Sequence, residues 1–247
     1  MSRSERILSV TGRTLNQLKE DRRFLAFSII FPVVIIYFLK IVMDVLVSPF
    51  FDPSIFVIPY GAFIVHFITF ILTAIVIVRE RTAGTLPRMF ISGYTQVDAI
   101  LGYLLAYTIL SSVQSLVVLL ELNWLFELNY SVKMLALLYL VMWLLSTISL
   151  ELGIFVSNFA RNEGQVIPFI PLILVSVLIS GVIVPVDKMP AWTQNFAFIS
   201  PLYYANEIIQ HLLVEGLFVD TLDKFFQLVL FGVVVLLLAV LTLQERD

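Results

Sequence analysis

The stretch Arg79–Asp98, RERTAGTLPRMFISGYTQVD, separates two long apolar runs and decides how the rest of the chain is organised. It carries three arginines, a glutamate, two glycines and a proline. A loop that only joined two apolar helices would not need so many charged and helix-breaking residues. We therefore predict that this stretch forms an exposed structure that another protein binds.

The composition on either side of this stretch is that of an integral membrane protein. Of 247 residues, 60% are hydrophobic and 13% are charged, whereas soluble proteins carry about 25% charged residues. The net charge of −3 gives no indication of nucleic-acid binding. The absence of cysteine excludes a disulfide framework and a thiolate metal site. No catalytic residue and no metal site are predicted.

Six stretches are long and apolar enough to be membrane spans, which need about 20 residues to cross a core about 30 Å thick. They cover residues of about 24–47, 55–78, 99–120, 134–156, 166–186 and 225–243. Residues 5–23 have the pattern of an amphipathic interfacial helix. Residues 185–216 predict two short helices, apolar but too short to span, which re-enter the outer leaflet or cover the mouth of a cavity. The predicted fold class is an all-α integral membrane protein with a single transmembrane domain over residues 1–247.

Arginine placement predicts the orientation of these spans. All ten arginines, together with Lys19, lie at the termini or in the loops after the second and fourth spans. The other four lysines lie on or near the opposite side. Because positive residues are enriched in cytoplasmic loops, we predict a multi-pass protein of the plasma membrane with both termini in the cytoplasm.

The polar stretch contains its own start and stop signals. Gly84 is expected to stop the second span, and Thr85 to cap a short helix that ends at Ser92-Gly93. Thr95, with Asp98 three residues later, predicts a capping box at the start of the third span. In the short helix, the apolar side chains Leu86, Met89 and Phe90 are expected to dock into a groove of a partner. An ordinary capped loop is the alternative.

A few polar side chains lie inside the predicted spans. Glu151 lies about 8–9 Å from the nearer end of its helix, where a carboxylate costs about 2.5–3.5 kcal/mol on insertion scales. A hydrogen bond to a neighbouring helix is favoured for it over contact with cargo or a proton. His66 is expected to pack as a neutral, hydrogen-bonded side chain. These two are the candidate polar residues of a cavity, whereas Lys40 and Asp44 are expected to pair.

Taken together, the segments resemble the membrane subunit of ABC exporters of the ABC-2 type. The likeness rests on RERTAGTL at residues 79–86 with ILGYLLA at 100–106, on ARNEGQ at 160–165, and on SG, P, MPAW and SPLYY within 180–204. Order and spacing agree over nearly the whole chain. Two positions depart from the family pattern: Pro87 stands where an acidic residue is usual, and Tyr103 where lysine is common.

The resemblance implies a permease subunit that pairs with a second, identical or related permease subunit and with two copies of a separate ABC ATPase subunit. Residues 79–95 would be the coupling segment and residues 185–216 an outer gate. The residues expected to contact the ATPase are Glu80, Arg81, Thr85, Leu86, Arg88, Met89 and Phe90. The residues expected to form the gate are Pro190, Trp192, Pro201, Tyr203 and Tyr204.

The chain itself is not expected to be an enzyme or to hold a cofactor. It contains neither G-x-x-x-x-G-K-[ST] nor G-x-G-x-x-G, so ATP and Mg²⁺ would bind the partner ATPase. An apolar path with few charges favours a lipophilic cargo, such as a drug, a peptide antibiotic or a lipid, with membrane lipids as further partners.

Several alternatives stay open at this point. A proton-coupled secondary transporter could use Glu151 and His66, although such proteins carry an inverted repeat and none is visible here. Export of a lipid-linked glycan and a purely structural assembly role also remain. An intramembrane hydrolase is disfavoured because the chain has no H-E-x-x-H motif.

Overall fold

The computed structural model describes residues 2–46, 54–214 and 217–243. Within these ranges the chain is built from helices and contains no strand, which confirms the predicted all-α class. The α-helices are α1 (Arg3–Glu20), α2 (Arg22–Leu46), α3 (Ser54–Thr82), α4 (Thr85–Ile91), α5 (Gln96–Leu125), α6 (Val132–Ser157), α7 (Ile170–Ile179), α8 (Ala191–Ala197), α9 (Pro201–Val214) and α10 (Leu222–Thr242). Three short 3₁₀ helices are η1 (Glu163–Phe169), η2 (Val186–Lys188) and η3 (Val219–Thr221).

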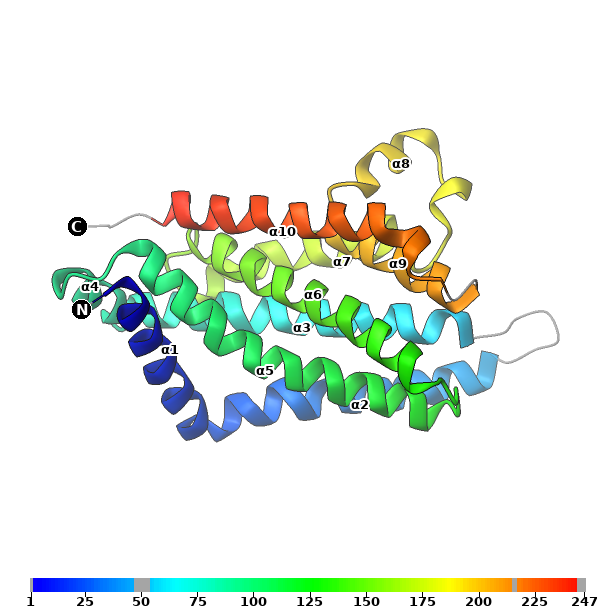
Figure 1. Cartoon of the computed structure of the whole chain (residues 1–247), viewed down its shortest axis with the longest axis horizontal. Coiled ribbons are helices and arrows are strands. Elements are labelled where there is room, and N and C mark those ends of the chain that lie inside the picture. The colour runs from blue at the N-terminus through cyan, green and yellow to red at the C-terminus, as the bar shows by residue number, and fades with distance from the viewer. Residues whose placement is uncertain (1, 47–53, 215–216, 244–247) are drawn as a thin grey trace.

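Five of the described helices, α2, α3, α5, α6 and α10 with η3, are long and apolar enough to cross a membrane. They lie side by side in an elongated bundle (Figure 1). The helix α3 is its centre, because 72% of its most apolar window is buried, against 17% for α2 and 22% for α10. The outer faces of α2 and α10 therefore carry the exposed apolar side chains expected of lipid-facing helices.

The fifth predicted span, Val166–Val186, is not one long helix. The α-helical part, α7, has 10 residues, which is about 15 Å, or half of the membrane core. Pro168 and Pro171 lack the N–H that a regular helix needs, so the segment starts as the 3₁₀ helix η1 and becomes α-helical late. The turn at Ser180-Gly181 then ends it. The described residues thus show five long helices and one short apolar one.

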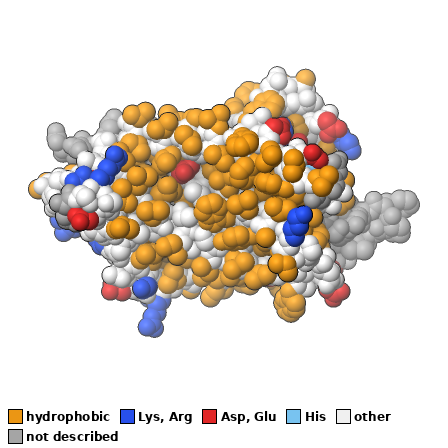
Figure 2. Space-filling view, viewed as in Figure 1, with side chains coloured by type: hydrophobic (Ala, Val, Ile, Leu, Met, Phe, Trp, Pro, Cys, Tyr) orange, Lys and Arg blue, Asp and Glu red, His pale blue; other side chains and the backbone are white. Residues whose placement is uncertain are grey.

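The two ends of the bundle differ in charge. The helices α1 and α4 lie at the same end as the last turn of α10 (Figure 1). Basic side chains gather at this end, whereas apolar side chains cover the middle of the visible face (Figure 2). We call it the arginine-rich end, and its counterpart, where α8 and α9 lie, the opposite end.

The predicted amphipathic helix 5–23 corresponds to α1, which is separate from α2 and meets it at an angle (Figure 1). It starts with a capping box between Ser2 and Glu5. Its residues Val10 and Leu18 are buried in a cluster that also contains Tyr103 of α5. The apolar face of α1 therefore packs largely against protein. The sequence pattern alone does not distinguish such a face from one that lies on a membrane surface.

Some predicted positions lie outside the described residues. These are Val47 at the end of the first predicted span, residues 215–216 at the end of the predicted outer segment, and Arg246. The predicted pair on α2 is present, with Lys40 Nζ 2.5 Å from Asp44 Oδ1.

Candidate functional site

The polar stretch at 79–98 forms the predicted order of helix, turn, short helix, turn and helix at the arginine-rich end. Gly84 links α3 to α4 with φ of 71°, in the left-handed region that favours glycine. The C-cap of α4 is Ser92, as predicted. The capping box of α5 is confirmed: Asp98 N donates to Thr95 Oγ1 (3.2 Å) and Thr95 N donates to Asp98 Oδ2 (3.0 Å).

The prediction that Thr85 caps α4 is wrong. Gly84 is the N-cap residue and no side chain caps the helix. Instead, Arg88 folds back over the turn, where its Nε donates to Gly84 O and its Nη2 to Ala83 O, both at 3.0 Å. A helix of seven residues is not stable by itself. Its position must therefore come from packing against the rest of the chain.

That packing corrects the expected role of the apolar residues of α4. Leu86 is 2% exposed, and Met89 is buried with it against Val10 of α1 and Tyr103 of α5. Phe90 is half-buried against the same cluster. Leu86 and Met89 hold α4 to its own chain and are not free to enter a partner, whereas Phe90 remains partly exposed. The apolar side chain that α4 presents outward is Ile91, which is 87% exposed.

Glu80 is also directed into the chain, toward α1 and α5. Its Oε2 accepts hydrogen bonds from Arg13 Nη2 (2.9 Å) and from Tyr103 Oη (3.0 Å), and its Oε1 accepts one from Gln17 Nε2 (3.2 Å). Burial lowers the pKa of Arg13, but Tyr103 and Glu80 outweigh this effect and leave it above the ordinary value. The guanidinium therefore stays charged and ties α1 to α3.

The arginines on either side of Glu80 bind two further segments. Arg79 Nε donates to Glu163 Oε1 of η1 (3.1 Å), and its Nη1 lies 3.7 Å from Asp21 Oδ2 between α1 and α2. Arg81 Nη1 donates to the main-chain oxygens of Ser157 (2.8 Å) and Ala160, at the end of α6. The three consecutive charged residues therefore connect the end of α3 to three different parts of the arginine-rich end.

Sequence analysis does not find the partners of these residues. Arg13 belongs to the polar face of α1, and Tyr103 is visible only as a departure from the family pattern. Asp98, predicted as a cap, is also 0% exposed and accepts a hydrogen bond from Arg6 Nε at 2.7 Å. The helix α1 is thus held to α3 and α5 by charged pairs as well as by apolar contacts.

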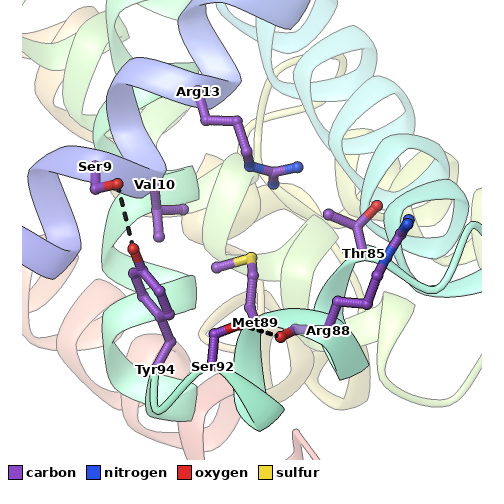
Figure 3. A pocket seen from close by; sticks show the side chains of 8 residues that line it. All are labelled: Ser9, Val10, Arg13, Thr85, Arg88, Met89, Ser92 and Tyr94. Atoms are coloured by element: carbon purple, nitrogen blue, oxygen red, sulfur yellow. Dashed lines mark hydrogen bonds between the residues drawn. The ribbon is translucent and has the colours of Figure 1, made fainter.

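A pocket of about 190 Å³ opens between α1 and α4. Figure 3 shows Arg13 and Arg88 on two sides of it, with Met89 at its floor and Tyr94 reaching across to Ser9. Tyr94 Oη donates to Ser9 Oγ at 3.3 Å. Two guanidinium groups beside several hydroxyls and an apolar floor can receive an acidic or apolar side chain.

The residues of the predicted outer segment divide between two helices. Pro190 and Trp192 belong to the start of α8, where Trp192 is 67% exposed. Pro201, Tyr203 and Tyr204 begin α9, which packs inside the bundle on α3, α6 and α10. Phe198, the C-cap of α8, contacts the second group: its main-chain oxygen accepts a hydrogen bond from Tyr204 Oη (3.1 Å), and its ring stands edge-on to Tyr203. The hydroxyl of Ser200, which directly precedes α9, has no hydrogen-bond partner among the described residues.

The two candidate polar residues inside the bundle have different surroundings. His66 is fully buried, and its Nδ1 is 2.7 Å from Ser149 Oγ of α6, which confirms the predicted hydrogen-bonded packing. Glu151 is 6% exposed, but its Oε2 has no hydrogen-bond partner among the described residues. It lies against α10, where a Cβ added to Gly232 would be 3.2 Å from that oxygen. The predicted hydrogen bond from Glu151 to a neighbouring helix is therefore not formed with any helix residue that the structure describes.

Comparison with known proteins is consistent with this arrangement. A family model described as "ABC-2 type transporter" matches residues 5–214. The chain is 26% identical over 175 residues to "Probable multidrug ABC transporter permease YbhR" of Escherichia coli (strain K12), covering 70% of this chain and 47% of that protein. It is 28% identical over 182 residues to "Probable multidrug ABC transporter permease YbhS" of the same strain, covering 70% and 48%.

A more distant relative carries a more specific name. The "Linearmycin resistance permease protein LnrN" of Bacillus subtilis (strain 168) is 22% identical over 141 residues, which cover 57% of this chain and 36% of that protein. The chain spans about half the length, or less, of the curated relatives that it matches.

Proposed function

This chain belongs to the ABC-2 type transporter family, and we propose that it is the permease subunit of an ATP-driven exporter in the plasma membrane. In this proposal the arginine-rich end faces the cytoplasm, because arginines are enriched on that side. A second permease subunit completes the translocation path, and two copies of a separate ABC ATPase subunit bind and hydrolyse ATP with Mg²⁺.

The proposed coupling surface consists of the outward side of α4, namely Pro87, Arg88 and Ile91, together with the pocket between α4 and α1. The observation that carries this proposal is the way α4 is held. Its inner side is buried in a cluster shared with α1 and α5, while Ile91 projects outward from the same helix. A partner that pulls on this surface would move α1, α3 and α5 together.

The proposed mechanism follows from that connection. ATP binding draws the two ATPase subunits together, and each displaces the α4 that is docked on it. Glu80 and its neighbours transmit the displacement to α1, to η1 and to the end of α6, because the three charged side chains bond to all of them. Rigid helix groups then rotate against each other and open the path toward the opposite end.

We further propose that the cargo is lipophilic, such as a drug, a peptide antibiotic or a lipid. The names of the relatives, which include multidrug permeases and a linearmycin resistance permease, support this class. The few charged side chains inside the bundle also favour an apolar molecule over a charged polymer.

The coupling surface is tested by reversing its chemistry without touching the buried side of α4. Arg88→Glu with Ile91→Asp should leave the permease folded and reduce co-purification of the ATPase subunit and cargo-stimulated ATP turnover at least tenfold. The matched control is Lys133→Glu with Val132→Asp at the opposite end, where Val132 is 84% exposed. Unchanged complex formation in the first variant, or an equal loss in the control, would show that α4 is not the coupling surface.

A further inference from the structure

A second and larger pocket lies at the opposite end of the bundle. It has a volume of about 640 Å³, within the range of about 300–1,000 Å³ of small-molecule sites. Its walls are the start of α3, the turn at 181–187, and the facing sides of α8 and α9. Figure 1 shows α8 standing off the bundle beside α9 at this end.

The charged groups of this pocket are carboxylates, which lie beside the amide side chains of Gln194, Asn195, Asn206 and Gln210. Two carboxylates, Asp187 and Glu207, line it, and none of the described lining residues is Lys, Arg or His. Neither carboxylate forms an ion pair with a described residue. The side-chain N–H groups of Gln194 are already used, since its Nε2 donates to Met189 O at 2.8 Å. The lining itself therefore offers negative charge, and one cation, Lys224, lies outside the lining against Tyr203 and interacts with Glu207.

A buried acceptor in the same wall lacks a partner. Asn206 is 2% exposed, and its Nδ2 donates to Ser180 O at 3.2 Å. Asn206 is one of the residues that line the pocket, and that bond orients its amide. Its Oδ1 has no hydrogen-bond partner among the described residues. A buried carbonyl without a donor is unfavourable, and an N–H group of a ligand would satisfy it.

The remaining wall is aromatic. Phe56, Phe198 and Tyr203 line the pocket, with the rings of Phe198 and Tyr203 5.4 Å apart and perpendicular. A cation of the chain already sits against this group: Lys224 Nζ lies 5.1 Å from the centroid of the Tyr203 ring and donates to its Oη at 3.2 Å. Aromatic faces attract cations, and the exposed ring of Phe198 extends the same surface.

We propose that this pocket binds organic cations, that is, molecules with an amine or guanidinium group on an apolar or aromatic body. The carboxylates of Asp187 and Glu207 would attract the charge, Asn206 Oδ1 would accept an N–H, and the aromatic wall would cover the body. A metal ion is a poorer fit, because the described residues hold no group of three or more metal-ligating side chains. The inference rests on the proposed function in one respect: on the export path, this pocket would be the last site that the cargo occupies before it leaves.

Binding is tested on the purified chain of residues 1–247 without the ATPase and without ATP. The probe is ethidium, an aromatic cation with amino groups, followed by fluorescence anisotropy, and an aromatic sulfonate of similar size serves as the anionic comparison. Asp187→Asn with Glu207→Gln should weaken ethidium binding at least tenfold, which corresponds to about 1.4 kcal/mol. The sulfonate should not bind more weakly to this variant than to the wild type.

The control variant is Asp220→Asn with Asp223→Asn, which removes the same charge from the same end but outside the pocket. It should bind ethidium as the wild type does, and circular dichroism should show all variants equally helical. Equal affinities for the wild type and the pocket variant, an equal loss in the control, or displacement of ethidium by submillimolar calcium would overturn the proposal. If ethidium binds as expected but the ATPase-loaded complex exports nothing, the proposed function fails while the site stands.

Discussion

The helices α4 and α8 have seven residues each and lie at opposite ends of the bundle, yet the chain holds them in opposite ways. In α4, Leu86 and Met89 are buried and the flanking charged residues bond to neighbouring elements. In α8, only Ala197 is buried, whereas Trp192 and Phe196 are exposed. Its main contacts are with α7 and η2, the short apolar helix and the turn that precedes α8.

This difference bears on how firmly each of the two helices is held. A helix fixed by buried side chains and ion pairs moves only with the elements that it contacts, which suits transmission of a displacement. A helix with few buried contacts has little packing to lose when it shifts, which suits a cover over a pocket. The predicted coupling role calls for a firmly held helix and the predicted gate role for a loosely held one. The packing of α4 and α8 differs in this way.

The largest expected effect comes from placing two charges on the buried side of α4. Leu86→Asp with Met89→Asp should unfold the arginine-rich end, since truncating one buried Leu or Met already costs about 2–5 kcal/mol and a buried unpaired charge adds to this. The same change in α8, Trp192→Asp with Phe196→Asp, should alter the free energy of unfolding by no more than about 0.5 kcal/mol. Thermal unfolding of the purified chain measures both. Equal loss in the two variants would remove the distinction between the helices.

A smaller effect is expected from neutralising one carboxylate at a time. Glu80→Gln should destabilise the chain by about 1.5–3 kcal/mol, because hydrogen bonds to charged groups contribute on that scale. Glu151→Gln should leave stability unchanged or raise it, since Glu151 Oε2 has no bond to lose. Export and thermal stability are measured side by side. A stable Glu151→Gln variant that no longer exports would assign Glu151 to the cargo path instead.

The smallest effect concerns the contact between α1 and α5. A Cβ on Gly102 would lie 2.5 Å from Val10 Cβ, whereas one on Gly12 would meet nothing within 4 Å. Overpacking costs about 1–3 kcal/mol, and the gain in helix propensity from Gly to Ala offsets about 0.5–1 kcal/mol. Gly102→Ala should therefore destabilise by about 1–2 kcal/mol and Gly12→Ala should be neutral or stabilising, as judged by thermal unfolding. A stabilised Gly102→Ala variant would mean that α1 is not packed tightly on α5.

Much of the fold was predictable because its signals are local. The capping box of Thr95 and Asp98, the pair of Lys40 and Asp44, and the stop at Ser92 each depend on residues within four positions of one another. The fifth predicted span is the one that the structure does not show as a single regular helix: apolar length predicted one helix over 166–186, whereas a 3₁₀ helix containing Pro168 leads into a short α-helix that ends at Ile179. Prolines near the start of a helix are compatible both with a full-length span and with an α-helix that starts only after them. Hydropathy does not distinguish these two structures.

The sequence by itself therefore determined the helical membrane class, the polar stretch that interrupts it, the turns around α4 and the family to which the chain is similar. These follow from composition, spacing and cap chemistry, which are properties of neighbouring residues. Only the tertiary structure decided which side of α4 is buried, that Glu80 binds Arg13, that Glu151 Oε2 has no hydrogen-bond partner in the described part of the chain, and that Asp187, Asn206 and Glu207 line one pocket. The physical reason is distance along the chain: Glu80 and Arg13 are 67 residues apart, and no local pattern records which distant side chains the packing of helices brings into contact.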